Sequence, residues 1–305
     1  SEMCIRDSVN SLYNIVDSYF VAQISEQAMT ALSLVYPLQL LETAIAVGFG
    51  VGMNAAAAYY LGAKEQQRAD DIVTSGLILS LLHGVILMAA TLLFAPAFVS
   101  LFTENEKILA DGVKYSNLVF IFAVPNVIAI TFEKIFQAEG RMKVSMLSML
   151  CGCVANIILD PLLIFGIGIF PKMGIEGAAI ATGIGQVIPL IVYLFVFIKY
   201  PVSLHFHWHK KNFQKRLVAQ MYGVGIPATL NLALPSFMIT ALNGILAVYS
   251  ASYVLVLGIY YKLQTFIYLS ANGIVQGIRP IISYNYGAGE RGLSLIHISE
   301  PTRHA

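Results

Sequence analysis

A carboxylate and an amide stand close together inside an otherwise apolar stretch of this sequence. Asn156 and Asp160 are four residues apart, so a helix places both side chains on one face. Gly152 continues that face one turn earlier and leaves room for a neighbouring helix or a ligand. Pro161 cannot donate a backbone hydrogen bond, which leaves the carbonyl of Ile157 without its helical partner. An ionisable residue in such a place is costly and is a functional candidate, the alternative being an aspartate at a kink that a neighbouring helix satisfies.

The composition indicates that these residues lie within a membrane. The 305 residues are 57% hydrophobic and 11% charged with a mean hydropathy of +0.73, whereas a soluble domain carries about 25% charged residues. Many of the hydrophobic segments exceed the ~20 residues that span a bilayer, so tilt or projection is expected. We therefore predict an all-α integral membrane protein. Its eight segments are Val9–Gln23, Thr30–Leu61, Ile72–Phe102, Val113–Ala138, Val144–Ile169, Ile175–Tyr200, Leu217–Tyr249 and Tyr253–Tyr286.

Both ends of the chain differ from this pattern. Residues 1–8 and 293–305 are polar and aperiodic, and they resemble translated sequencing-adapter sequence. We expect both to be artefacts and the first helix to be truncated. The three cysteines, Cys4, Cys151 and Cys153, predict neither a disulfide framework nor a metal pair.

The basic residues predict the orientation of the chain. They concentrate in the loops after the second, fourth and sixth segments, and the other loops contain few. The positive-inside rule then places the N-terminus and the linker at residues 201–216 in the cytoplasm. We expect a multi-pass protein of the inner (plasma) membrane. The net charge of +1 gives no reason to expect a nucleic-acid partner.

An internal repeat links the second and eighth segments. A shift of 225 positions aligns them without a gap. Six segments lie in one period, so the two copies have the same orientation, as in the parallel repeats of two-lobed transporters. We expect a six-helix lobe at residues 9–200 and the first two helices of a second lobe at residues 217–292. The aligned pairs include Tyr36 with Tyr261, Gly48 with Gly273, Gly52 with Gly277, Tyr59 with Tyr284 and Gly62 with Gly287.

Several motifs give the chain a family resemblance between about residues 9 and 292. They are LYNIVDSYFVAQ (12–23), VGFGVGMNAAAAYYLGAK (47–64), FQAEGRMK (136–143), NIILDPLLIFG (156–166), GIEGAAIAT (174–182) and GIRPIISYNYGAG (277–289). With these motifs the sequence resembles the multidrug and toxic compound extrusion (MATE) family. Members are twelve-helix, two-lobed exporters that use a sodium or proton gradient to expel small molecules, mostly cationic and aromatic.

The resemblance also implies a site. The cation site of the family's N-terminal lobe maps onto Asp17, Asn156, Asp160 and Thr182, and a lobe-lining tyrosine maps more loosely onto Tyr115. It implies Na⁺ or H⁺ as the coupling ion, no other cofactor and a monomeric protein.

The predicted topology supports this mapping independently. Asp17, Asp160 and Thr182 lie six, nine and seven residues from the outer ends of their segments. At 1.5 Å per residue, all three lie roughly 10–13 Å below the outer surface. Two carboxylates with amide and hydroxyl oxygens suit a hard cation such as sodium, and equally a shared proton.

Other polar residues each have two alternative roles. Asn14, one turn before Asp17, lines the same pocket or packs against a helix. Lys262 lies inside the eighth segment, where it lines the central cavity or balances a carboxylate. For His205, His207 and His209 a zinc site is the alternative to a linker that faces lipid headgroups, which their basic setting favours.

The leading functional hypothesis is secondary active export of drugs. A flippase or exporter of lipid-linked saccharides is the alternative, but an anionic cargo needs several basic cavity residues and this lobe offers few. An intramembrane enzyme would need catalytic groups. The sequence contains no HExxH, no aspartate-rich DDxxD and no serine–histidine pair at membrane depth, so we expect no enzymatic activity.

Overall fold

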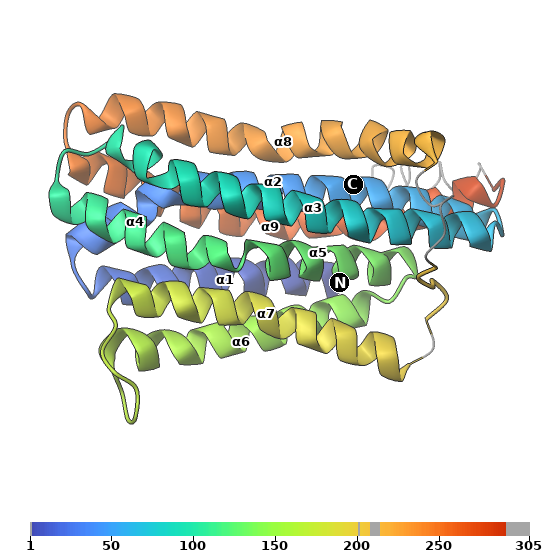
Figure 1. The fold of residues 1–305 in the computed structure, drawn as a ribbon, viewed down its shortest axis with the longest axis horizontal. Helices are drawn as coiled ribbons and strands as arrows, with labels where there is room; N and C mark the ends of the chain where they lie inside the picture. Colours follow the sequence, from blue (N-terminus) through green and yellow to red (C-terminus); the bar gives the residue numbers. More distant parts are fainter. Residues whose placement is uncertain (1, 201, 208–213, 291–305) are drawn as a thin grey trace, which may run out of the picture.

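The computed structural model describes residues 2–200, 202–207 and 214–290, where the regular secondary structure is helical. The side chain of Lys262, residue His209 and the segment 293–305 lie outside the described residues. The helices run side by side along one direction and turn back at the two ends of the bundle (Figure 1). They are α1 (Glu2–Ala22), α2 (Glu26–Gly62), α3 (Gln66–Ser100), α4 (Glu106–Ile121), α5 (Ala123–Ala138), α6 (Met142–Phe165), α7 (Ile175–Lys199), α8 (Lys215–Ala247) and α9 (Ala251–Gly287).

The predicted all-α membrane fold is confirmed. Among the described residues, five helices are long and apolar enough to cross a bilayer, or six if the bent pair α4 and α5 counts as one span. Each of the eight predicted segments coincides with a helix, except that the fourth is divided between α4 and α5.

The break between α4 and α5 bends the chain by 48° at Phe122. Pro125 has no backbone N–H, so it cannot continue the hydrogen bonds of α4, but it is tolerated in the first turn of a new helix. The N–H of Asn126 closes that turn by donating to the carbonyl of Phe122 at 3.0 Å. The Phe122 ring packs against α7 at Gly183, where a methyl group would overlap it. The break therefore places Asn126 at the start of a helix within the bundle.

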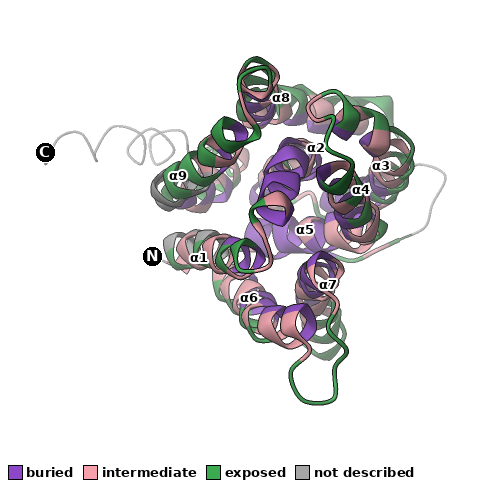
Figure 2. Ribbon diagram, turned by 90° about the vertical axis from the view of Figure 1, so that its left-hand side faces the viewer, coloured by how far each residue is buried: buried purple, intermediate pink, exposed green. Residues whose placement is uncertain are grey.

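Helix α2 is the central helix of the bundle. It is buried along much of its length, and α3, α5, α8 and α9 pack around it (Figure 2). Its approach to α8 depends on small residues, because a methyl group on Gly52 would overlap the carbonyl oxygen of Met221. A helix buried on all sides has no polar stripe. The burial of α2 therefore depends on neighbours from both parts of the chain, the first lobe (α1–α7) and the two helices of the second (α8 and α9).

The sequence repeat has a counterpart in the packing of α2 against α9. A methyl group on Gly62 would overlap the carbonyl oxygen of Tyr284, and one on Gly287 would overlap that of Tyr59. The two contacts are equivalent, because the shift of 225 positions relates Gly62 to Gly287 and Tyr59 to Tyr284. At the other end of the pair, Gly258 packs against Ser33, its own equivalent. A twofold axis between α2 and α9 therefore relates the two helices.

The described part of the linker packs against the ends of α3 and α5. The N–H of His205 donates to Asp70 Oδ1 at 2.9 Å, and the N–H of Leu204 donates to Glu139 Oε1 at 2.8 Å. The rings of His205 and His207 are exposed and stack on each other with centroids 6.1 Å apart. Within the described residues, no group of three His, Cys, Asp or Glu side chains is placed to hold a metal ion.

Candidate functional site

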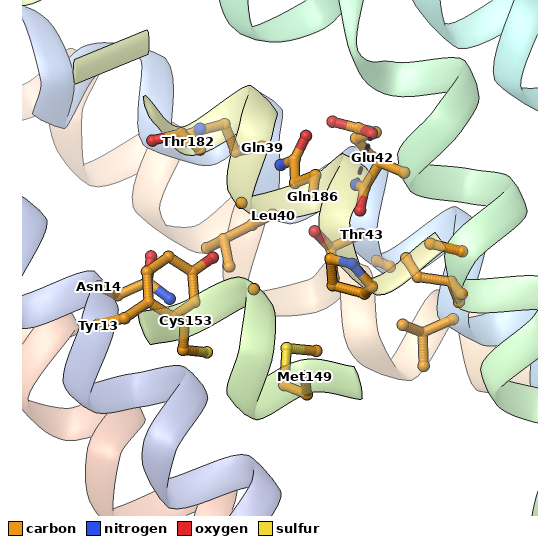
Figure 3. Close-up of a pocket in the computed structure, with 18 of the residues that line it drawn as sticks. Tyr13, Asn14, Gln39, Leu40, Glu42, Thr43, Met149, Cys153, Thr182 and Gln186 are labelled. Atoms are coloured by element: carbon orange, nitrogen blue, oxygen red, sulfur yellow. Dashed lines mark hydrogen bonds between the residues drawn. The ribbon is translucent and has the colours of Figure 1, made fainter. Parts of the chain in front are cut away.

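A cavity of about 320 Å³ lies between helices of both parts of the chain. Helices α2 and α7 contribute the most lining residues, and α1, α4, α5, α6, α8 and α9 contribute the others. Figure 3 shows Tyr13, Asn14 and Cys153 on one side and Glu42 on the other, with Leu40 and Gln186 between them. The cavity thus has two polar ends that come from different helices.

The first polar end is built around Asn156. In the amide orientation that satisfies both neighbours, its Nδ2 donates to Asp160 Oδ2 at 3.2 Å and its Oδ1 accepts from the Thr182 N–H at 3.2 Å. Asp160 is completely buried behind Asn156, whereas Asn156 and Thr182 line the cavity. The structure therefore brings these three predicted residues together.

Close packing of α6 on α7 makes this arrangement possible. A methyl group on Gly152 would overlap the carbonyl oxygen of Gly185, and one on Gly185 would lie 3.0 Å from Asn156 Cβ. The room that Gly152 was predicted to leave is thus filled by a helix. The two backbones are close enough for Asn156 to reach the main chain of α7.

Helix α1 adds the second carboxylate. Asp17 is 5% exposed and lines the cavity, and its charge interacts directly with that of Asp160. The Tyr115 hydroxyl accepts from Gln39 Nε2 at 3.5 Å and interacts with Thr182 and both carboxylates. All four residues of the predicted cation site therefore meet at one end of the cavity. Such a set of oxygens can take up a hard cation or share a proton.

Two further predictions concern lining residues. Tyr115 and Asn14 both line the cavity, and Asn14 lies next to Tyr13 on α1. The predicted role of Lys262 falls on a side chain outside the described residues. The tyrosines of the wall are Tyr13, Tyr36, Tyr115, Tyr193 and Tyr261, of which Tyr36 and Tyr261 are equivalent under the repeat.

The second polar end was not predicted. Glu42 of α2 is 3% exposed, lines the cavity and accepts a hydrogen bond from Asn126 Nδ2 at 3.1 Å (Figure 3). The signal in the sequence was a glutamate sixteen residues after the start of an apolar helix. A carboxylate at that depth is as unusual as Asp17.

A buried charge network lies near the cavity at Lys134. This lysine is 1% exposed, and its Nζ donates to Glu133 Oε1 at 3.1 Å, to Gln137 Oε1 at 3.0 Å and to Gln276 of α9. The Lys134 side chain therefore pairs with groups inside the protein and does not extend to the membrane surface. The network joins α5 to α9 and so links the two parts of the chain.

Comparisons with known proteins concern the family and the fold of the chain. A family model described as MatE matches residues 3–162. The multidrug export protein MepA of Staphylococcus aureus (strain NCTC 8325 / PS 47) is 29% identical over 291 residues, which cover 94% of this chain and 63% of MepA. The chain thus spans less than two thirds of that curated relative.

Two solved structures are similar to the chain in fold. One is the MATE multidrug transporter DinF-BH in complex with R6G, with a TM-score of 0.86 and 26% identity, covering 94% of this chain and 64% of that one. The other is a MATE family transporter of the MOP superfamily in an outward-facing conformation, with a TM-score of 0.82 and 23% identity, covering 97% and 66%. The second likeness concerns the fold alone.

Proposed function

Because the chain belongs to the MatE family, we propose that it forms the cation-coupled part of a secondary active multidrug exporter. The observation that carries the proposal is the meeting of Asp17, Asn156, Asp160 and Thr182 at one end of a cavity with aromatic walls. A drug and a coupling ion then share one enclosed space. The exporter would act as an antiporter in the plasma membrane as a monomer, with its N-terminus in the cytoplasm.

Coupling would arise from charge neutralisation at the acidic end. Without a cation, two buried carboxylates repel each other, which would oppose further closure of α1 on α6. A sodium ion or proton bound there removes the repulsion, so that α1, α6 and α7 close around it. Asp160 lies one residue before Pro161, and we assign the hinge to this part of α6. Closure would reshape the cavity and release the drug.

The walls of the cavity favour aromatic and cationic cargo. Tyrosine rings stack on flat molecules and attract cations to their faces. No lysine or arginine occurs among the described lining residues. An anionic lipid-linked saccharide would require such residues, so this alternative has less support.

The test is dye efflux by the full-length protein that carries this chain. Cells without other exporters are loaded with a fluorescent cationic dye, and efflux is followed across external pH and sodium concentration. We expect efflux that depends on one of the two gradients in the wild type and none in the Asp17→Asn, Asp160→Asn double variant. Undiminished gradient-driven efflux in a well-expressed double variant would reject the site.

A further inference from the structure

We propose that Glu42 and Asn126 form a second binding point in the cavity, which takes the positive charge of a lipophilic cation carried as substrate. The inference rests on the proposed export function and names a residue pair for its substrate. It assigns drug and coupling ion to separate carboxylates.

The surroundings of Glu42 are those of an anion that lacks a cation. The residue lies in an apolar helix, is 3% exposed and lines the cavity. Its one hydrogen bond within the described structure comes from the neutral amide of Asn126, and no lysine, arginine or histidine there pairs with it. A buried carboxylate is costly unless it is paired. A cationic guest in the cavity would supply the missing charge.

The broken helix provides the second observation. Asn126 lies in the first turn of α5, which begins at Ala123 after the break at Phe122. The N-terminus of a helix favours a negative charge beside it. The break therefore holds Glu42 in place on the cavity wall through Asn126.

The carboxylates of the two polar ends of the cavity are carried by different helices. Glu42 is on α2 and its partner is on α5, whereas the acidic end is formed by α1, α6 and α7. Glu42 shares its helix face with Gln39 and lies near Thr43 on the same wall (Figure 3). A guest bound between the two ends can thus place its charge at Glu42 and its rings against tyrosines, without displacing the coupling ion.

Two aromatic probes of similar shape test this inference on the purified full-length protein. Tetraphenylphosphonium carries one positive charge, and triphenylphosphine oxide is neutral. Binding of each probe is measured by equilibrium dialysis for wild type, Glu42→Gln and Glu42→Asp. Glu104→Gln makes the same chemical change at an exposed loop position and is the matched control.

We expect Glu42→Gln to weaken tetraphenylphosphonium binding about tenfold, because it removes a charge-assisted contact, and to leave the neutral probe unaffected. Glu42→Asp should keep most of the cation affinity, which separates a charge effect from misfolding, and Glu104→Gln should match the wild type. Equal losses for both probes, or no loss for either, would overturn the inference. If the wild type binds both probes and Glu42→Gln binds them equally well, only this inference is rejected. If the wild type neither binds nor exports either probe, the export function is rejected too.

Discussion

The first two helices of the chain and their repeat equivalents, α8 and α9, are alike in construction but unlike in chemistry. Helices α2 and α9 have equivalent serine N-caps, Ser25 and Ser250, each in an extended conformation with φ of −171°. Their C-caps, Ala63 and Ala288, both have φ of −71°. The backbone thus repeats even at the helix ends.

The carboxylates of the cavity do not repeat. Under the shift of 225 positions, Asp17 corresponds to Leu242 and Asn14 corresponds to Ile239. Glu42 likewise corresponds to an isoleucine at position 267. The comparison teaches that packing and capping are constrained in both copies, whereas the cavity carboxylates Asp17 and Glu42 occur in the first copy alone. Coupling is therefore expected to be asymmetric and centred on the first copy.

The largest effect on efflux should follow when Asp17 in the first copy is replaced by leucine, the residue at the equivalent position 242 of the second copy. Asp17→Leu removes one of the two interacting carboxylates, so we expect complete loss of gradient-driven dye efflux with near-normal expression. The control is Leu242→Asn, the equivalent position in the second copy, which should keep efflux close to wild type. Similar losses in both variants would show that coupling is shared between the copies.

The contacts between α2 and α9 should behave symmetrically instead. Gly62→Ala and Gly287→Ala each force a methyl group into a main-chain carbonyl, and we expect each to lower the free energy of unfolding by about 1–3 kcal/mol. Thermal unfolding of the purified protein measures both. Gly223→Ala in α8 is the control, because no atom lies within 4 Å of its added methyl group. A loss in only one of the two glycine variants would argue against a true twofold relation.

The neutral ligands of the acidic end should matter less than its carboxylates. Asn156→Ala and Thr182→Ala each remove one uncharged oxygen, so we expect cation affinity to fall about tenfold. Asn156→Ala should be the more severe because Asn156 also bonds to Asp160. The sodium or proton dependence of efflux gives the affinity, with Thr91→Ala on α3 as the control, since its hydroxyl bonds only to its own helix. Unaltered cation dependence in both variants would remove these residues from the site.

The smallest effect concerns the two helix caps. Ser25 accepts from the N–H of Ala28 and Ser250 from that of Ser252, so alanine at either position should cost about 1 kcal/mol of stability. Equal shifts in unfolding temperature are expected. A clear difference between the two would mean that the helix starts are not equivalent.

The sequence predicted those features that depend on one helix or on one repeated pattern. Hydrophobic length located the helices, and the four-residue spacing of Asn156 and Asp160 located one face of the acidic end. The family resemblance implied that Asp17 and Thr182 would join them, and the depth of these residues along their segments supported that mapping. These inferences succeed because a helix has a fixed rise and a fixed period.

The contacts of Glu42 and of the linker, which join segments far apart in the sequence, could not be predicted. The partner of Glu42 is Asn126, 84 residues away, and the pairing arises from a bend that Pro125 permits but does not require. Likewise, the hydrogen bonds of the linker with Asp70 and Glu139 arise only once the start of α3 lies beside the end of α5. Neither contact leaves a periodic signal in the sequence.

The contact of α2 with α9 also bears on how such a chain can evolve. Gly62 meets Tyr284 while Gly287 meets Tyr59, which is the self-complementary geometry of an interface between two identical subunits. Two separate polypeptides, each carrying one copy of the repeat, could associate through this contact without any new surface. In such a dimer every substitution would occur twice, and an acid could not exist on one side alone. Joined in one polypeptide, the copies can diverge one residue at a time, and the single acidic end of the cavity is a form that only the fused chain can have.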